Sequence, residues 1–285
     1  MGRKTNKNMS ENFKMIAKTF YGFEDILSEE LLALGAQKIN KGNRNVSFYG
    51  DKGFLYKSNL SLRTALKILK PVCEFRFKDI NEYYDNIYSF KWEDYIGPTG
   101  SFLINSVVFH SHVFNNSKFT SLKAKDAIVD RFRDKFKKRP SINSFNPELR
   151  IEIHVNRNTC TISLDSSGES LHKRGYKKYN SAAPLNEVLA AGIVLMSKWD
   201  KKSDLLDPMC GTGTFLIEAA MIAKNIAPNL NRLSFAFEKW KDWDNELFEI
   251  IEESVRSKEI DFDYKLYGFD ISNAMVKKAQ KNIEV

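Results

Sequence analysis

One stretch of this chain decides its fold: Leu205-Leu-Asp-Pro-Met-Cys-Gly-Thr-Gly-Thr-Phe-Leu-Ile-Glu-Ala-Ala220. The leading leucines predict a short buried strand, and the residues after the second glycine are helix formers. Gly211 and Gly213 allow a sharp turn and a close approach to a ligand. A second strand-like run, residues 264–270, also ends in a carboxylate, Asp270. Together these features predict a nucleoside-binding edge on an α/β sheet.

Other readings of the glycine turn fit less well. A P-loop needs Gly-Lys-Ser/Thr, which does not follow Gly211 or Gly213. A dinucleotide fingerprint needs a third glycine, where this chain has Leu216, and an acidic residue about 20 residues further on. Here Asp270 lies 57 residues after Gly213. A turn without any ligand would suit a lone Gly-x-Gly, but the whole string from Asp207 to Thr214 favours a ligand site.

The string resembles the cofactor-binding motif of class I S-adenosylmethionine-dependent methyltransferases. Its flanks resemble the THUMP-domain RNA methyltransferases, in particular the bacterial 23S rRNA guanine-N2 methyltransferase group. The resemblance runs from about Phe13 to the last residue and is specific across residues 168–240. The segments that carry it are Gly168-Glu-Ser-Leu-His-Lys-Arg-Gly-Tyr176, Ala183-Pro-Leu-Asn-Glu-Val-Leu-Ala-Ala191, Glu218-Ala-Ala-Met-Ile-Ala-Lys-Asn-Ile-Ala-Pro228 and Phe237-Glu-Lys-Trp240.

This resemblance implies a fold of mixed α/β and α+β class. A ferredoxin-like module and a THUMP RNA-binding unit would precede an incomplete Rossmann-like methyltransferase domain. The cofactor would be S-adenosyl-L-methionine, with its methionine part wrapped by the glycine turn and its ribose hydroxyls bound by Asp270, since a carboxylate can accept both hydrogen bonds of a diol. The helix that starts near Pro184 would close over the other side. The implied cofactor-binding residues are Asp207, Cys210, Gly211, Thr212, Gly213, Thr214, Asp270, Pro184, Asn186 and Glu187.

The resemblance also implies a reaction, the direct transfer of a methyl group to N2 of a guanine in 23S rRNA. The base would be flipped into the pocket if it is paired. The family's acceptor loop, Asn/Asp-Pro-Pro-Tyr, does not occur in the sequence. We therefore expect a truncated enzyme that has no catalytic residue of its own and is inactive alone. The alternatives are a tRNA guanine-N2 or DNA adenine-N6 methyltransferase and, from another class, a non-catalytic RNA-binding module.

Charge is unevenly distributed along the chain. Residues 1–182 contain 31 Lys and Arg against 19 Asp and Glu, a net charge of +12, whereas residues 183–285 have a net charge of −4. A basic front half predicts a polyanionic partner, with 23S rRNA first and tRNA second, although a solvated lysine-rich surface is the alternative. The candidate phosphate contacts lie on a predicted helix, residues 117–139, and are Lys123, Lys125, Arg131, Lys135, Lys138 and Arg139.

A second basic segment, residues 172–179, interleaves four basic residues with two tyrosines. Such a segment could hold phosphates and stack an unpaired base, or it could be a linker packed against both neighbouring modules. We expect a structural linker that lies along the RNA path. Its candidate RNA contacts are Lys173, Arg174, Tyr176 and Lys177.

Composition indicates a globular chain from a reducing compartment. Apolar residues make up 42% of the 285 residues, and the three cysteines form neither a zinc pattern nor a disulfide framework. The polar start has no signal-peptide core, and the longest apolar run, Leu189–Met196, is too short for a bilayer. These features predict a cytoplasmic protein without membrane or metal partners, and they leave its oligomeric state open.

Periodicity predicts the order of elements in the front half. Helices are expected at 24–34, 52–60, 80–89 and 117–139, and strands at 13–20, 45–49, 65–68, 73–78 and 102–110, with a hairpin of residues 149–156 and 159–165. The predicted domains are a flexible N-terminus (1–12), a ferredoxin-like module (13–64), THUMP (65–166), a basic linker (167–182) and the N-terminal part of the methyltransferase domain (183–285).

Overall fold

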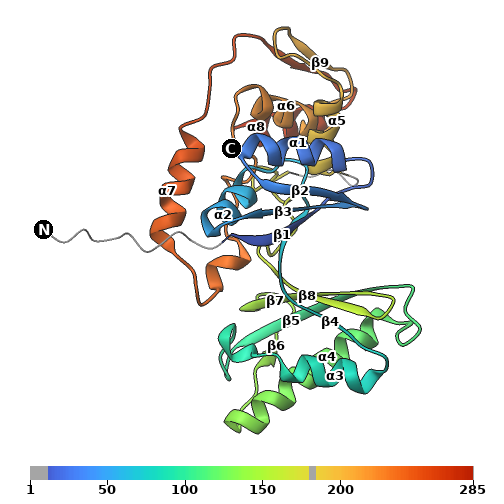
Figure 1. Cartoon of the computed structure of the whole chain (residues 1–285). Coiled ribbons are helices and arrows are strands. Elements are labelled where there is room, and N and C mark those ends of the chain that lie inside the picture. Colours follow the sequence, from blue (N-terminus) through green and yellow to red (C-terminus); the bar gives the residue numbers. More distant parts are fainter. Residues whose placement is uncertain (1–11, 180–183, 285) are drawn as a thin grey trace, which may run out of the picture. The chain divides into compact units, whose positions relative to one another are not determined.

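The computed structural model describes residues 12–179 and 184–284, which form two compact units (Figure 1). Unit 1 contains the residues up to Ile68, Ser170–Leu233 and the residues from Glu246 onward; unit 2 contains Leu69–Glu169 and Ser234–Asn245. The first module and the cofactor-binding segment therefore belong to one unit, although they are distant in sequence. Residues 1–11 of the predicted flexible N-terminus and residues 180–183 lie outside the described residues.

Unit 1 begins with a small α+β module. Its strands β1 (Phe13–Lys18), β2 (Gln37–Gly42) and β3 (Asn45–Gly50) form an antiparallel sheet in the order β2-β3-β1. Helices α1 (Glu24–Leu34) and α2 (Lys52–Ser61) complete the module. Alternate residues of β1 and β3, such as Met15 and Phe48, are fully buried, as are Leu27 and Leu31 of α1.

The second part of unit 1 is an α/β segment. It contains α5 (Glu187–Met196), β9 (Leu205–Asp207), α6 (Thr214–Ala223), α7 (Asn245–Arg256), β10 (Leu266–Gly268) and α8 (Asn273–Ile283). Strands β9 and β10 pair in parallel, with Asp207 opposite Gly268. A Cβ at Gly268 would lie 2.4 Å from Leu216 Cδ1 of α6, so glycine allows the strand and the helix to pack closely.

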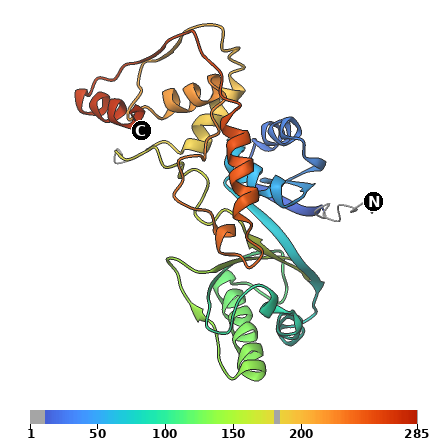
Figure 2. The same cartoon turned by 90° about the vertical axis from the view of Figure 1, so that its left-hand side faces the viewer.

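Unit 2 is a sheet with two helices on one face (Figure 2). The strand order is β4-β8-β7-β5-β6, with β4 (Lys67–Arg76), β5 (Ser101–Phe109), β6 (Ser141–Ile142), β7 (Leu149–Asn156) and β8 (Thr159–Asp165). The helices are α3 (Ile80–Ser89) and α4 (Ser117–Phe136), with short 3-10 turns η1 (Trp92–Asp94) and η2 (Ala236–Lys239). Ile151, Ile153, Cys160 and Ile162 are at most 1% exposed, as the alternating hairpin pattern predicts.

The structure corrects three expectations about these elements. The strands expected at 65–68 and 73–78 are one strand, β4, whose pairing shifts register between Pro71 and Cys73, because proline lacks the N–H that a regular ladder needs. Strand β2 had no sequence signal, since it is an exposed edge strand without apolar alternation. Helix α4 ends at Phe136 rather than at 139, because Lys137 has the left-handed conformation with φ 55°.

Candidate cofactor site and nucleic-acid surface

The two carboxylates singled out in the sequence meet at the carboxyl ends of β9 and β10. The Phe269 N–H donates to the Asp207 carbonyl (2.9 Å), and the Cys210 N–H donates to the Phe269 carbonyl (2.8 Å). The Gly211 N–H donates to Asp270 Oδ2 at 3.0 Å. The structure therefore joins the glycine turn directly to the second acidic strand end, 59 residues away in sequence.

The glycine turn needs both of its glycines in the left-handed region. Gly211 has φ 53° and Gly213 has φ 82°, and Gly213 is the residue that precedes helix α6. A Cβ at Gly213 would lie 3.2 Å from Ala279 Cβ of α8, whereas a Cβ at Gly211 would meet nothing within 4 Å. The space beside Gly211 is therefore open, as a ligand-binding turn requires.

Asp207 and Asp270 differ in how their oxygens are engaged. Asp270 Oδ1 accepts from the Ser272 N–H (2.8 Å) and Oδ2 from Gly211. Asp207 Oδ1 accepts from the Met209 N–H (3.1 Å), while its Oδ2 is buried and has no hydrogen-bond partner among the described residues. A buried acceptor without a partner costs about 1–3 kcal/mol, so a ligand that donates a hydrogen bond there would be stabilised.

Three further residues of the turn are buried. Cys210, Thr212 and Thr214 are at most 7% exposed, so they pack the turn against its surroundings. Burial raises the pKa of the Cys210 thiol, and nearby Asp207 and Asp270 raise it further. Cys210 is therefore a packing residue and not an activated nucleophile.

Asn282 is a site residue that the sequence did not reveal. Its side-chain amide donates to the Thr212 carbonyl (3.2 Å) and to the Tyr179 carbonyl (2.9 Å), and its Oδ1 accepts from the N–H groups of Lys178 and Tyr179. Asn282 is 2% exposed. A single asparagine on a helix has no sequence signature, yet here it connects the linker to the glycine turn.

The start of α5 is held by its own neighbours. Asn186 is the helix cap and accepts from the Leu189 N–H (3.2 Å), and Glu187 is 6% exposed and lies 3.3 Å from Lys177 Nζ. Pro184 is exposed. A role for these three residues in cofactor binding remains a prediction, because their observed contacts stabilise the helix start and the linker.

Three of the four linker residues that are predicted to contact RNA have largely buried side chains in this structure, and their contact with RNA stays a prediction. Arg174 and Tyr176 are 1% and 4% exposed, and the Lys177 side chain is 9% exposed. Arg174 pairs with Glu218 of α6 (2.7 Å), and the Tyr176 hydroxyl donates to the same carboxylate (2.9 Å). These three side chains are internal supports, whereas Lys173 is exposed.

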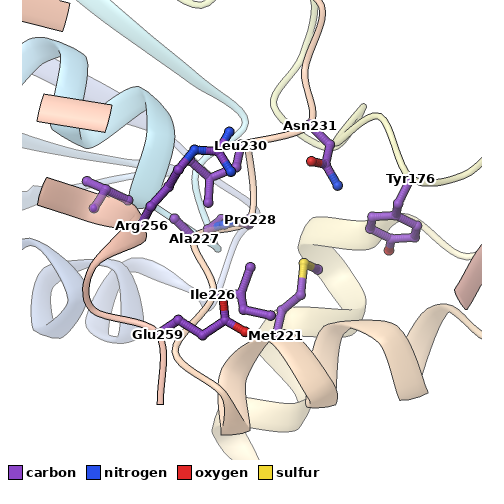
Figure 3. A pocket seen from close by; sticks show the side chains of 10 residues that line it. Tyr176, Met221, Ile226, Ala227, Pro228, Leu230, Asn231, Arg256 and Glu259 are labelled. Carbon is purple, nitrogen blue, oxygen red and sulfur yellow. The ribbon is translucent and has the colours of Figure 1, made fainter. Parts of the chain in front are cut away.

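A cavity of about 220 Å³ lies beside this support (Figure 3). Tyr176 and Asn231 line one side, with Met221 and Ile226 below and Arg256 and Glu259 opposite. None of its lining residues belongs to the glycine turn. The cavity is therefore separate from the edge where Asp207 and Asp270 meet.

The basic face predicted on α4 is partly neutralised. Arg131 donates from Nε and Nη2 to the two carboxylate oxygens of Glu93 (2.8 and 2.7 Å), and Lys135 Nζ donates to Glu93 Oε1 (2.5 Å). Lys125 pairs with Asp126 (2.7 Å). Arg131 thus has a structural role in this unit, and its contact with phosphate stays a prediction. Lys123 is half-buried, and Lys138 and Arg139 are exposed.

We expect the Glu93 cluster to make unit 2 sensitive to acid. Hydrogen bonds from Arg131 and then from Lys135 hold the pKa of the Glu93 carboxyl well below its usual range, against the opposing effect of burial. Because the folded pKa is depressed, this stabilisation is present above about pH 4.5 and is lost as pH falls toward the folded pKa. Thermal unfolding measures the effect. The difference in the free energy of unfolding between wild type and Glu93→Gln should be largest near pH 7 and should shrink below pH 4.5. Glu74→Gln, at an exposed position, is the control, and its stability difference from wild type should not depend on pH in this way. A difference that shrinks in acid for Glu74→Gln but not for Glu93→Gln would contradict the role of the Glu93 cluster.

The described residues lack two further kinds of feature. No described helix is both long and apolar enough to cross a membrane. Within residues 12–179 and 184–284, no group of three or more His, Cys, Asp or Glu side chains is placed to hold a metal ion.

Three family models match successive parts of the chain. They are the RlmL ferredoxin-like domain at residues 14–69, the THUMP domain at 77–165 and the RMKL-like methyltransferase domain at 174–285. The fold and the site together define a class, the methyltransferases that join a Rossmann-like cofactor domain to THUMP. The chain belongs to the THUMP-containing, RMKL-like methyltransferase family.

Similar proteins agree with this assignment. The ribosomal RNA large subunit methyltransferase K/L of Buchnera aphidicola is 37% identical over 94% of this chain, and a putative RNA methyltransferase of Synechocystis sp. is 35% identical over 92%. The chain spans 39% of the first protein and 68% of the second. A solved structure of SMU.472, a putative methyltransferase complexed with SAH, is 33% identical, covers 97% of this chain and 73% of its own, and has a TM-score of 0.84. The predicted family and fold class are confirmed.

S-adenosylmethionine is the cofactor that this family implies, and the observed residues fit it. The unpartnered Asp207 Oδ2 is an anionic acceptor suited to the ammonium of the methionine part. The Asp270 carboxylate accepts two N–H groups, which leaves lone pairs for a ribose diol. A Cβ at Gly211, whose N–H donates to Asp270, would meet nothing within 4 Å, so the turn is open there.

Proposed function

We propose that this chain binds S-adenosylmethionine at the β9–β10 edge and serves in methylation of RNA. The observation that carries the proposal is the bond from the Gly211 N–H to Asp270 Oδ2, which brings the turn and the second carboxylate to one edge. The names of the relatives, which refer to large-subunit ribosomal RNA, support RNA as the class of substrate.

For the acceptor, we propose N2 of a guanine in 23S rRNA, with THUMP docking the RNA. When bound, the cofactor supplies an electrophilic methyl group, and the amine that accepts it loses a proton. The residues of this chain bind and orient the reactants. Such positioning lowers the activation barrier, because it makes a reaction between two molecules effectively unimolecular. We place this methylation of RNA in the cytoplasm, where thiols stay reduced. The three free cysteines, Cys73, Cys160 and Cys210, support this location.

Calorimetric titration with S-adenosylhomocysteine tests the cofactor site. Asp207→Asn keeps an oxygen for the Met209 N–H but removes the charge and the unpartnered acceptor, so we expect at least tenfold weaker binding, about 1.4 kcal/mol. The matched control is Asp204→Asn at the other end of β9, where Asp204 accepts from the Lys265 N–H (2.8 Å). That control should bind within about twofold of wild type.

Two outcomes would overturn the cofactor proposal. One is equal affinity in the Asp207 and Asp204 variants, and the other is no binding by a wild-type chain whose unit 1 is folded by circular dichroism. The expectation that residues 1–285 do not methylate RNA by themselves stays a prediction. A transfer assay with labelled cofactor and 23S rRNA, tRNA and DNA fragments checks it and compares the alternative acceptors.

A further inference from the structure

The face of the unit 2 sheet opposite α3 and α4 carries a row of residues suited to nucleic acid. Pairing places Arg76 opposite Thr159, Thr159 opposite Asn156, and Asn156 opposite Phe109. Residues directly opposite each other in a sheet share a face, so one row crosses the four strands β4-β8-β7-β5. It contains a cation, two hydrogen-bonding side chains and an aromatic ring.

The row ends in an exposed aromatic ring, which lies beside a partly buried histidine. Phe109 is 50% exposed, and its ring lies 5.5 Å from the ring of His154 in the neighbouring strand. His154 belongs to the next row of the same face, opposite Val107, which is 45% exposed. Large exposed rings on a sheet are unfavourable in water unless a ligand covers them, and aromatic faces on a sheet are platforms for unstacked bases.

Two arginines at this end of the sheet have no carboxylate partner among the described residues. Arg157 lies in the hairpin turn, and its N–H donates to the Phe109 carbonyl (2.9 Å). Arg76 and Arg157 are exposed, and neither forms an ion pair with any described residue. By contrast, Arg131, Arg133 and Lys135 of α4 all pair with carboxylates. We name Arg76, Phe109, His154, Asn156 and Arg157 the hairpin-tip surface.

The acidic residues of this face lie further from the tip. Glu74 is opposite Thr161 and accepts from its hydroxyl (3.1 Å), and Glu152 is opposite Asn105 and accepts from its amide (3.0 Å). Both precede the tip residues of their strands, Arg76 and Asn156. The tip row itself contains no carboxylate, so its charge is complementary to a polyanion.

We propose that the hairpin-tip surface binds unpaired RNA, with a base stacked on Phe109 and phosphates held by Arg76 and Arg157. This inference deepens the proposed function and rests on its RNA docking. The proposed contact with RNA therefore lies at the end of the unit 2 sheet, whereas the amino-acid sequence predicts contacts on the basic face of α4. Unpaired RNA is the occupant because a duplex keeps its bases stacked inside, where a ring on a flat sheet cannot reach them.

Fluorescence anisotropy with a labelled, unstructured RNA of about a dozen nucleotides and its duplex tests the surface. Phe109→Ala should weaken binding of the single strand about tenfold, since a stacked base contributes about 1–3 kcal/mol, and should leave duplex binding unchanged. Phe109→Tyr keeps a ring and should retain affinity. Because Phe109 is half exposed, neither change should unfold unit 2.

The arginines have a matched control in the same unit. Arg76→Gln with Arg157→Gln should lower the slope of log K against log salt by about 1.4, for two phosphate contacts on a single strand. Lys138→Gln with Arg139→Gln removes the same charge from the other end of the sheet, where the Ser141 N–H donates to the Gly100 carbonyl. The nine residues of β5 separate the two ends by about 30 Å. This control should leave the slope almost unchanged.

The results separate the inference from the function on which it rests. RNA binding that is insensitive to Phe109→Ala, or that is lost in the Lys138 and Arg139 variant instead, overturns the hairpin-tip surface while RNA docking stands. A folded wild-type chain that binds no RNA at any salt concentration overturns both, and the calorimetric cofactor titration then shows whether the cofactor site stands alone.

Discussion

Replacing Arg174 by Met should lower the free energy of unfolding of unit 1 by about 3–5 kcal/mol. Both partners of the Arg174–Glu218 pair have fully buried side chains, with 2.7 Å between Nε and Oε1. Arg174 Nη2 also donates to the Arg63 carbonyl (2.7 Å). Without the guanidinium, Glu218 would keep the Tyr176 hydrogen bond but lose its opposite charge, and an unpaired buried charge is strongly destabilising.

Acid should reduce this loss. Burial raises the pKa of the Glu218 carboxyl, and Arg174 opposes that rise. In Arg174→Met this largest opposing effect is gone, although Tyr176 and Arg63 still lower the pKa, so the pKa rises and the carboxyl becomes neutral at a higher pH. A raised folded pKa means that stability is lost as pH increases. Urea unfolding should therefore show the largest loss of unfolding free energy in Arg174→Met at pH 7–8 and a smaller loss near pH 5.

Two further variants check the cause. Adding Glu218→Gln to Arg174→Met removes the unpaired charge and should recover part of the lost stability. Lys173→Met, next in sequence but exposed, should change stability by less than about 0.5 kcal/mol. Equal losses in the Lys173 and Arg174 variants, or a loss that is independent of pH, would contradict the role of the pair.

Replacing Gly175 by Ala should cost unit 1 about 3 kcal/mol, the second largest expected effect. Gly175 has φ 96°, and a Cβ there would lie 2.0 Å from the backbone oxygen of Asn231. The left-handed conformation penalises any side chain, and the backbone cannot yield as a flexible side chain can. Asn231 stands beside Tyr176 at the edge of the cavity in Figure 3, so a shift there would disturb the Tyr176–Glu218 bond.

Gly35 is a control that separates the cost of the left-handed conformation from the cost of steric overlap. It ends α1 with φ 98°, but a Cβ there would meet nothing within 4 Å. Gly35→Ala should therefore cost about 1 kcal/mol, the conformational penalty alone. Thermal unfolding of both variants measures the difference, which is due to the contact with Asn231. Equal losses at the two positions would mean that steric overlap adds nothing at Gly175.

Much of the fold followed from the sequence, because the signals concerned are local. The hairpin of β7 and β8 alternates apolar residues, and its alternate side chains such as Ile151 and Ile153 are buried as expected. The helix α1 ends at Gly35, as a glycine after an apolar helical pattern predicts. The cofactor turn could also be predicted, since Asp207, Gly211 and Gly213 belong to one βα unit, whose backbone sets their spacing.

Long-range partners decided the rest. The basic residues of the linker and of α4 read alike in sequence, yet Arg174 and Arg131 pair with Glu218 and Glu93, 44 and 38 residues away. The row from Arg76 to Phe109 exists because four strands pair in one register, which depends on packing across the whole sheet. The cofactor turn, the family resemblance and the excess of positive charge could all be predicted from the amino-acid sequence. Which of these charges are neutralised and which stay exposed depends on the folded structure, because burial and pairing involve residues that meet only after folding.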